Sequence, residues 1–382
     1  MKLYDILSTG LQAKASDIHL KAGIPPVYRI DGALRPLGKM PRMTPEATLK
    51  IAIEIMNEGQ REHFEENHEL DLAYGVPGLG RFRVNVFSQR GSVSMVMRSI
   101  PFGVKTLEEL FLPPVLKKIA ENNRGLVLVT GATGTGKSTS LAAMIDYVNS
   151  NRTSHIVTIE DPIEFLHRDK KSIINQREIG YDTNNFNVAL KSALRQDPDV
   201  ILVGEMRDSE TIETALTAAE TGHLVFSTLH TVDATETVNR IVSVFPPYHQ
   251  RQVRLQLSSV IKGIVSQRLV PRADGQGRVP AVEVMVGTAR TKELIDNKDK
   301  TKEIRDAIQQ GYVSYGMQTF DQSLLSLLKK ELITLEEALR QATNPEDLKL
   351  KMSGISSGSD TSWDDFDKSR DEEENPQEDF GS

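Results

Sequence analysis

The string Gly-Ala-Thr-Gly-Thr-Gly-Lys-Ser at residues 131–138 constrains this chain more than any other feature of its sequence. Residues 125–130, just before it, form an apolar, β-branched run that is typical of a buried parallel strand. Residues 139–148, just after it, combine good helix formers with apolar residues at helical spacing. A strand, a glycine-rich turn and a helix in this order are the setting in which G-x-x-x-x-G-K-[ST] cradles phosphate groups.

This loop predicts a site for a nucleoside triphosphate. Its glycines let backbone N–H groups curl around the β-phosphate, and the helix N-terminus adds partial positive charge. We expect Lys137 to reach the β- and γ-phosphates and the Ser138 hydroxyl to ligate Mg²⁺. The alternative, a glycine turn that binds nothing, is disfavoured by the flanking strand and helix. The predicted nucleotide-binding residues are Gly131, Ala132, Thr133, Gly134, Thr135, Gly136, Lys137, Ser138 and Thr139.

Length and composition exclude several classes of protein. At 382 residues the chain is too long for one ordinary core, so two domains are expected. No run approaches the roughly 18 apolar residues of a membrane span, and the N-terminus lacks the apolar region of a signal peptide. The chain has no cysteine, which excludes disulfides and thiolate-bound metals and fits a cytoplasmic location.

The net charge of −7 is unevenly distributed. Residues 353–382 carry ten acidic and two basic residues, a net charge of −8 that leaves +1 for residues 1–352. The nearly neutral body argues against a nucleic-acid binder that relies on a large positive charge, although a local basic channel stays open. The tail is rich in Ser, Gly and acidic residues, so it is predicted to be disordered, and a solvating role is favoured over partner binding.

Residues 1–100 are expected to form an α+β domain, followed by a linker at 101–104. The segment 27–32 is expected to be a strand that ends in an Asp-Gly turn. At 80–90 and 92–98, alternation of apolar with polar residues predicts a hairpin of two more strands. Two helices are predicted as well, at 44–57 and 58–67. Thr44 is the expected N-cap of the first, with Pro45 at its first position.

Residues 105–352 show strands alternating with helices instead. The predicted strands are apolar runs at 125–130, 155–160, 199–204 and 223–229, with helical stretches between them. This alternation predicts a mostly parallel sheet covered on both faces. From about 288 to 350 the chain is predicted to be helical.

The segment 197–205 is an apolar strand that ends in a carboxylate, the arrangement of a Walker B motif. Glu205 occupies the position where that motif usually has Asp, and its expected role is to hold Mg²⁺ through water. The alternative is a surface glutamate that happens to follow a core strand.

Two other strand ends carry candidate catalytic side chains. Glu160 and Glu164 flank a turn at Pro162, and one of them is expected to act as general base on water. Helix caps or plain surface acids are the alternative. His230 ends the strand at 223–229, where it would sense the γ-phosphate or couple neighbouring sites. The alternative for His230 is a structural histidine.

Taken together, these segments resemble the secretion-superfamily hexameric ATPases, in the PilT/PilU branch of type IV pilus retraction ATPases. The likeness covers about residues 1–350 and is carried by seven segments: 16–19, 131–138, 158–164, 175–178, 194–208, 219–231 and 316–321. The resemblance implies an α/β chain that forms a homohexameric ring. It implies a PAS-like domain at 1–100 and a RecA-like P-loop domain with C-terminal helices at 105–352.

The resemblance also implies roles for single residues. The family's catalytic glutamate falls on Glu164 and its Walker B glutamate on Glu205. Arg81, Arg83 and Arg98 match positions that contact nucleotide phosphates across the subunit interface. A guanidinium supplied in trans stabilises transition-state charge and makes hydrolysis depend on ring assembly. The alternative is that these arginines are ordinary solvent-facing strand residues.

The implied function is a motor that hydrolyses ATP with Mg²⁺ to retract pili, and so supports twitching motility. Its expected partners are an inner-membrane platform protein and the pilus machinery at the cytoplasmic face, with no nucleic acid and with membrane association through partners alone. Residues 289–295 match the family's retraction segment only loosely, and the acidic tail is outside the family pattern. Both departures leave open an accessory PilU-like ATPase, and a RecA-like nucleic-acid translocase is a further alternative.

Overall fold

The computed structural model describes residues 2–100 and 103–352, which form two compact units. Unit 1 contains the described residues up to Val104 together with the segments Asp161–Arg168 and Arg177–Asn184. Unit 2 contains the rest of the described chain. The predicted acidic tail at 353–382 and two residues of the predicted linker at 101–104 lie outside the described residues.

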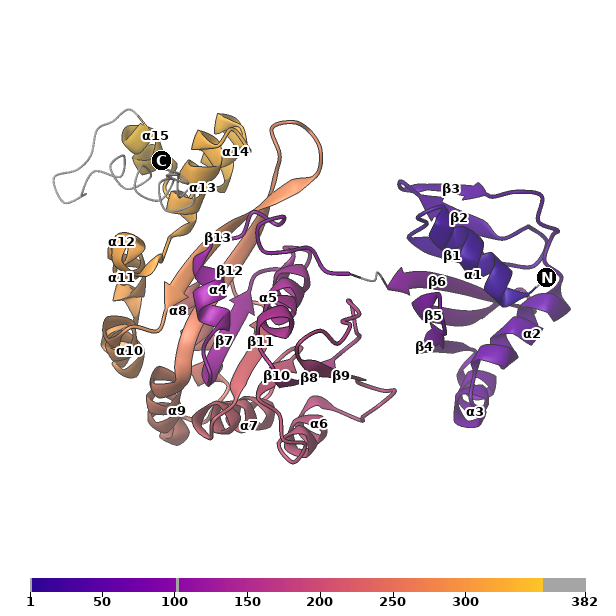
Figure 1. The fold of residues 1–382 in the computed structure, drawn as a ribbon, viewed down its shortest axis with the longest axis horizontal. Helices are drawn as coiled ribbons and strands as arrows, with labels where there is room; N and C mark the ends of the chain where they lie inside the picture. The colour runs from indigo at the N-terminus through magenta and orange to yellow at the C-terminus, as the bar shows by residue number, and fades with distance from the viewer. Residues whose placement is uncertain (1, 101–102, 353–382) are drawn as a thin grey trace, which may run out of the picture. The chain divides into compact units, whose positions relative to one another are not determined.

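Unit 1 is built on a six-stranded sheet in which all neighbouring strands are antiparallel (Figure 1). The strands lie in the order β3-β2-β1-β6-β5-β4. In chain order its elements are α1 (Leu3–Gln12), β1 (Asp17–Leu20), β2 (Val27–Ile30), β3 (Ala33–Pro36), α2 (Pro45–Ile55), α3 (Glu58–Asn67), β4 (Glu69–Val76), β5 (Gly80–Gln89) and β6 (Ser92–Ile100).

Local sequence signals account for much of unit 1. Asp31 and Gly32 both adopt positive φ, as the tight turn between β2 and β3 requires, which confirms the predicted Asp-Gly turn. Thr44 accepts the N–H of Ala47 and Pro45 is the first residue of α2, so the predicted helix start is confirmed. The predicted hairpin is confirmed as β5 and β6, and the inward side chains of β5 are fully buried: Phe82, Val84 and Val86.

Unit 2 is built on a seven-stranded sheet in the order β13-β12-β7-β11-β10-β8-β9. The strands from β12 to β8 pair in parallel, and β13 adds an antiparallel edge. The mostly parallel sheet is therefore confirmed. The strands are β7 (Gly125–Thr130), β8 (His155–Glu160), β9 (Ile173–Glu178), β10 (Val200–Val203), β11 (Leu224–Leu229), β12 (Ile261–Pro271) and β13 (Arg278–Val286).

Helices of unit 2 follow the strands and pack on the sheet, for example α5 on β7 and α7 on both β7 and β11 (Figure 1). The predicted helical region after residue 288 is confirmed as a series of short helices. The helices are α4 (Val115–Ala120), α5 (Lys137–Asn151), α6 (Phe186–Ala193), α7 (Ser209–Glu220), α8 (Ala234–Ser243), α9 (Pro247–Val260), α10 (Ala289–Asp296), the 3₁₀ helix η1 (Lys298–Glu303), α11 (Ile304–Gln310), α12 (Tyr312–Tyr315), α13 (Phe320–Lys329), α14 (Leu335–Gln341) and α15 (Pro345–Met352).

The parallel strands β7, β11, β10 and β8 end at the same edge of the sheet. Their register places Thr130 beside Leu229, and Val203 beside both Ser227 and Ile159. Segments that leave these strands therefore start close together, although they are far apart in the sequence. The loop at 131–138 leaves from this edge.

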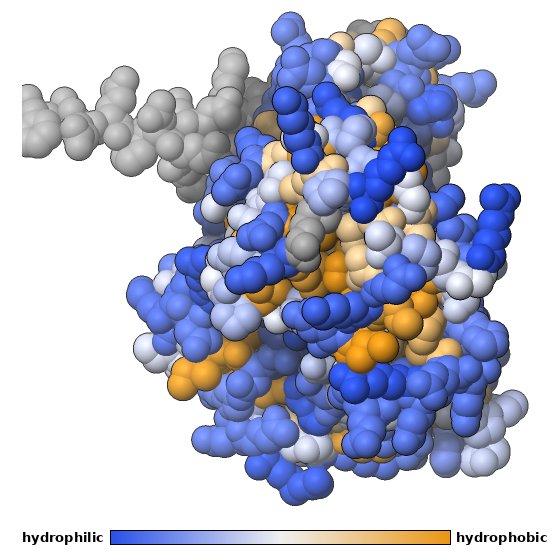
Figure 2. All heavy atoms as spheres, turned by 90° about the vertical axis from the view of Figure 1, so that its right-hand side faces the viewer, coloured by the Kyte–Doolittle hydropathy of each residue, from blue (hydrophilic) through white to orange (hydrophobic). Residues whose placement is uncertain are grey.

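The face of the molecule drawn in Figure 2 is mostly hydrophilic. Within the described residues, no helix is long and apolar enough to cross a membrane. Figure 2 shows a face on which apolar side chains gather in the middle of hydrophilic ones. Exposed apolar side chains of unit 1 include Leu34, Leu49 and Ile53.

Candidate nucleotide-binding site

The loop at 131–138 joins β7 to α5 and depends on its glycines. Gly131, Gly134 and Gly136 have φ values of +145°, +80° and +87°, a region that favours glycine. A Cβ at Gly131 would come within 2.5 Å of the Gln267 carbonyl oxygen, and one at Gly136 within 2.8 Å of Gln267 Nε2. Backbone conformation and close approach to β12 therefore both require glycine here.

Lys137 begins α5 and directs its ammonium group back into the loop. Its Nζ donates to the carbonyl of Gly131 at 2.8 Å and to that of Ala132 at 3.0 Å. The hydroxyl of Thr135 also donates to the carbonyl of Ala132, at 2.9 Å. Lys137 is buried, so its positive charge lies within the loop. This is where a phosphate cradle needs its cation.

The predicted nucleotide-binding residues run from the loop into the first turn of α5, and several of them are accessible. Ala132, Thr133 and Gly134 are exposed, and Ser138 and Thr139 are partly exposed. Ser138 follows Lys137 directly, at the helix N-terminus where backbone N–H groups lack helical partners. The loop can therefore present several N–H donors and the hydroxyls of Ser138 and Thr139 to an anion.

Glu205 and His230 lie together at the same edge of the sheet. Glu205 Oε1 is 3.6 Å from His230 Nε2, and its other oxygen is 2.7 Å from the guanidinium of Arg207. Two bonds bring the ends of β10 and β11 together: the Thr228 hydroxyl donates to the carbonyl of Gly204 at 2.6 Å, and the N–H of Met206 donates to the carbonyl of Thr228 at 3.5 Å. The Glu205 side chain keeps 20% of its surface exposed, so it can accept further ligands.

Glu160 and Glu164 have different surroundings. Glu160 ends β8 in unit 2, where its Oε1 accepts from the Thr158 hydroxyl at 2.7 Å and from Gln176 Nε2 at 3.1 Å. These bonds hold the carboxylate in place. Glu164 lies in the segment 161–168, which belongs to unit 1, and it is exposed. Its role as the general base stays a prediction.

The three arginines of the β5–β6 hairpin also differ in their contacts. Arg98 lies opposite Asp17 on β1, and its Nε donates to the Asp17 carboxylate at 2.8 Å. Arg81 donates to Glu178 at 3.0 Å, and its guanidinium lies 5.5 Å from the ring centre of Tyr181. Arg83 is exposed. Two of the three predicted phosphate contacts are thus engaged with carboxylates of unit 1.

Asp17 is the buried partner in the first of these pairs, at 4% exposure. Its carboxylate accepts from the Ser16 hydroxyl at 2.8 Å and lies 3.7 Å from Arg29, besides its bond to Arg98. Burial raises the pKa of Asp17, but hydrogen bonds from Ser16 and Arg98 outweigh it and hold that pKa below its usual value. The segment 16–19 thus contributes to the fold of unit 1 through the ionised carboxylate of Asp17.

Gln267 is a site residue that the sequence analysis did not identify. It lies on β12, next to the loop, and bonds to Thr135 and Ser140. A signal for it exists: Ser266, Gln267 and Arg268 are consecutive polar residues in a mostly apolar strand. The Ser266 hydroxyl accepts a buried hydrogen bond from the Thr130 hydroxyl, which explains a polar residue at that position.

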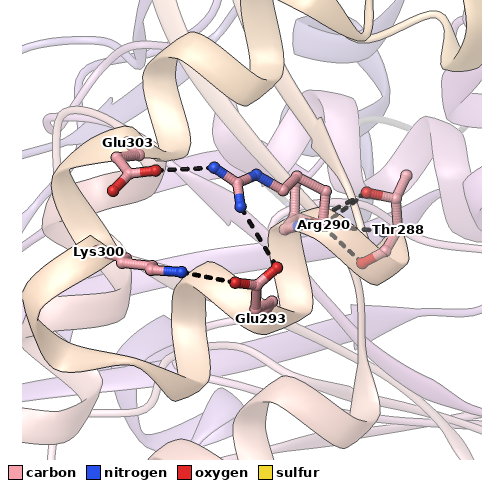
Figure 3. A network of polar contacts seen from close by, with 6 residues as sticks. Thr288, Arg290, Glu293, Lys300 and Glu303 are labelled. Carbon is pink, nitrogen blue, oxygen red and sulfur yellow. Dashed lines mark hydrogen bonds and ion pairs between the residues drawn. The ribbon is translucent and has the colours of Figure 1, made fainter.

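The loosely matching segment 289–295 forms most of α10. A capping box between Thr288 and Thr291 starts the helix, and Leu294 and Ile295 are buried. Figure 3 shows the polar network on its exposed side: Arg290 contacts Glu293 at 3.3 Å and Glu303 at 2.7 Å, and Lys300 contacts Glu293 at 2.8 Å. Exposed ion pairs of this kind contribute about 0–1 kcal/mol each, so the network orients side chains more than it stabilises the fold.

A metal at the predicted phosphate loop would share its ligands with the bound phosphates. Across residues 2–100 and 103–352, no group of three or more His, Asp and Glu side chains is arranged to hold a metal ion. Mg²⁺ at phosphate sites is commonly held by one or two protein oxygens, the substrate's phosphates and water. Ser138 and Glu205 supply oxygens of that kind.

Comparison with known proteins decides the family. The chain matches the family described as "Type II/IV secretion system protein" over residues 2–340. The chain belongs to this family. It is 49% identical over 346 residues to the pilus retraction ATPase PilT of Pseudomonas aeruginosa, covering 91% of this chain and 99% of that protein. It is 46% identical over 350 residues to the type IV pilus ATPase PilU of the same organism, covering 92% and 91%.

A solved structure agrees with the sequence relatives. The crystal structure of the pilus retraction motor PilT with bound ADP superposes with a TM-score of 0.83 at 49% identity, covering 91% of this chain and 99% of that one. The expected membership in the PilT/PilU branch and the expected ATPase class are confirmed by these comparisons. The roles predicted for single residues stay predictions.

Proposed function

We propose that this chain is an ATP-hydrolysing motor that drives type IV pilus retraction. The observation that carries the proposal is the phosphate loop with Lys137 turned into it, in a chain that aligns over nearly its whole length with PilT. The fold supports it, because the loop, Glu205 and His230 leave one edge of a parallel sheet.

In the chemistry proposed at this edge, a few groups each have a separate role. Lys137 and the backbone N–H groups of the loop bind the β- and γ-phosphates, and Ser138 and Glu205 hold Mg²⁺, directly and through water. Mg²⁺ supplies charge neutralisation at the phosphates. Glu164, or Glu160 in its place, removes a proton from the attacking water. His230 contacts Glu205 and reports the state of the γ-phosphate.

The proposal extends to the assembled motor. Unit 1 is assigned as the PAS-like domain and unit 2 as the RecA-like domain of a homohexamer. In the ring, Arg81, Arg83 or Arg98 reaches a phosphate of a neighbouring subunit. The ring acts at the cytoplasmic face of the inner membrane on a platform protein and the pilus machinery.

A PilU-like accessory ATPase is the second candidate. Identity to PilU, at 46%, is close to the 49% with PilT, and both relatives align over more than nine-tenths of the chain. Cells that lack this chain distinguish the two functions. Cells that lack a retraction motor should lose retraction, whereas cells that lack an accessory ATPase should keep retraction by the main motor.

The purified full chain provides the first biochemical test. We expect Mg²⁺-dependent ATP hydrolysis that Lys137→Ala abolishes and that added DNA leaves unchanged. Absence of hydrolysis by the assembled protein would contradict the motor. Strong stimulation by DNA would favour the translocase, against which the net charge of +1 on residues 1–352 already argues.

A further inference from the structure

Gln267 lies on β12 against the phosphate loop, and only 3% of its surface is exposed. Both polar ends of its carboxamide are used. Nε2 donates to the carbonyl of Thr135 at 2.7 Å, and Oε1 accepts from the Ser140 hydroxyl at 2.7 Å. The Thr135 carbonyl can only accept, so it determines which end of the carboxamide faces the loop. One side chain of β12 therefore connects the loop to the first turn of α5.

The bond to Thr135 also sets the direction of the next N–H group. In a planar trans peptide, C=O and N–H point in opposite directions. The Thr135–Gly136 peptide is trans, and its carbonyl points at Gln267. The N–H of Gly136 consequently points away from β12. The close approach described for Gly131 and Gly136 shows that the loop rests on this residue at two points.

We propose that Gln267 is a positioning residue of the phosphate loop, which holds the Thr135–Gly136 peptide so that the N–H of Gly136 is aimed at a nucleotide phosphate. This inference rests on the proposed nucleotide chemistry at residues 131–138. Both polar ends of the Gln267 carboxamide are already engaged within the chain. Its effect reaches the ligand through the loop backbone, in a site where peptide N–H groups do much of the binding.

The requirement for glutamine follows from the two bonds. A glutamate of the same size would set a carboxylate oxygen against the Thr135 carbonyl and could not donate to it. A methionine would fill the space but leave the Thr135 carbonyl and the Ser140 hydroxyl without this buried partner. Both changes free the peptide to rotate, one by repulsion and one by loss of contact.

The test measures ADP and ATP binding with the purified full chain, alongside the steady-state KM and kcat for ATP. Gln267→Glu and Gln267→Met should each raise the nucleotide Kd and the KM about tenfold, the effect of one lost hydrogen bond to a charged group. Gln252→Met, an exposed glutamine on α9, is the matched control and should behave as wild type. Circular dichroism at the assay temperature confirms that each variant is folded.

The outcomes separate the inference from the proposed function. Wild-type protein that neither binds nor hydrolyses ATP would contradict the proposed function. Wild-type protein that binds ATP, together with two folded Gln267 variants whose Kd stays within about twofold, would overturn the positioning role alone. Ser140→Ala keeps the bond to Thr135 and should raise the Kd less than Gln267→Glu does. An equal rise would assign the effect to Ser140 instead.

Discussion

Glu205 and His230 face each other across the ends of two neighbouring parallel strands, with 3.6 Å between Oε1 and Nε2. The contact joins residues from two predicted motifs that are 25 positions apart in the chain. Because the Thr228 hydroxyl bonds to the carbonyl of Gly204, the two strand ends cannot separate without losing that bond. His230 therefore lies within contact distance of Glu205 and four residues before the start of α8.

Neutralising Glu164 and neutralising Glu205 are expected to affect activity in different ways. Glu164→Gln keeps size and hydrogen bonding but removes a base, so ATP should bind normally while kcat falls by about 10²–10⁴-fold. Glu205→Gln should instead raise the Mg²⁺ concentration needed for half-maximal activity. Steady-state kinetics over a Mg²⁺ titration distinguish the two. Normal turnover by Glu164→Gln would move the base to Glu160 or Glu205.

Lys137→Ala removes the cation that contacts the Gly131 and Ala132 carbonyls. We expect the Kd for ATP to rise at least about tenfold and hydrolysis to be lost, because charge-assisted hydrogen bonds to phosphate disappear. The fold should survive, which circular dichroism checks. Near wild-type hydrolysis by this variant would show that the loop is not the phosphate cradle.

Ring assembly should complete the active site if an arginine is supplied in trans. Arg83 is the best candidate: Arg83 and Arg98 are both exposed, but Arg98, like Arg81, contacts a carboxylate of unit 1. Arg83→Ala rings should be inactive. Mixing them with Lys137→Ala chains should restore some activity. Some sites then combine the intact loop of an Arg83→Ala chain with the intact Arg83 of a neighbouring Lys137→Ala chain. Failure of the mixture to regain activity would count against Arg83 and leave the loop assignment intact.

Stability should depend on pH through Glu283, a buried residue of β13 that accepts the N–H of Ala234 at 2.9 Å. Burial raises the pKa of Glu283 from 4.5 to about 7. The folded chain therefore binds more protons than the unfolded chain between these values, so stability falls as the pH rises from 4.5 through 7. The shift corresponds to about 3 kcal/mol.

Glu283→Gln should remove this dependence, because glutamine stays neutral and still accepts from Ala234. Thermal unfolding midpoints at pH 5 and pH 8 provide the measurement. Wild type should lose more stability between the two pH values than Glu283→Gln does. Equal losses would show that Glu283 titrates alike in the folded and unfolded chain.

Signals that are local in the sequence predicted the fold best. The glycine-rich loop after an apolar strand, the Asp31-Gly32 turn and the Thr44 cap each depend on a few consecutive residues, and each is found where it was predicted. Strands β12 and β13 were not predicted, because an apolar run does not by itself distinguish a strand from a buried helix. Such runs also do not show that β12 pairs in parallel with β7 and antiparallel with β13.

Contacts between residues that are distant in the sequence were not predicted either. Gln267 meets Thr135 across 132 positions, and Glu178 meets Arg81 across 97. Neither pairing has a local pattern, since each depends on which elements the fold brings together. The match at 175–178 marked Glu178 as part of the family pattern without indicating its partner.

Surface piliation and twitching of cells that lack this chain test the central claim most directly. A strain carrying the deletion should be hyperpiliated and unable to twitch, because pili still assemble but are not withdrawn. Expression of the wild-type chain should restore both traits, and Lys137→Ala, with its impaired loop, should restore neither. Deletion cells that retain full twitching would point to an accessory role, and bald deletion cells would contradict retraction and indicate a motor for pilus assembly.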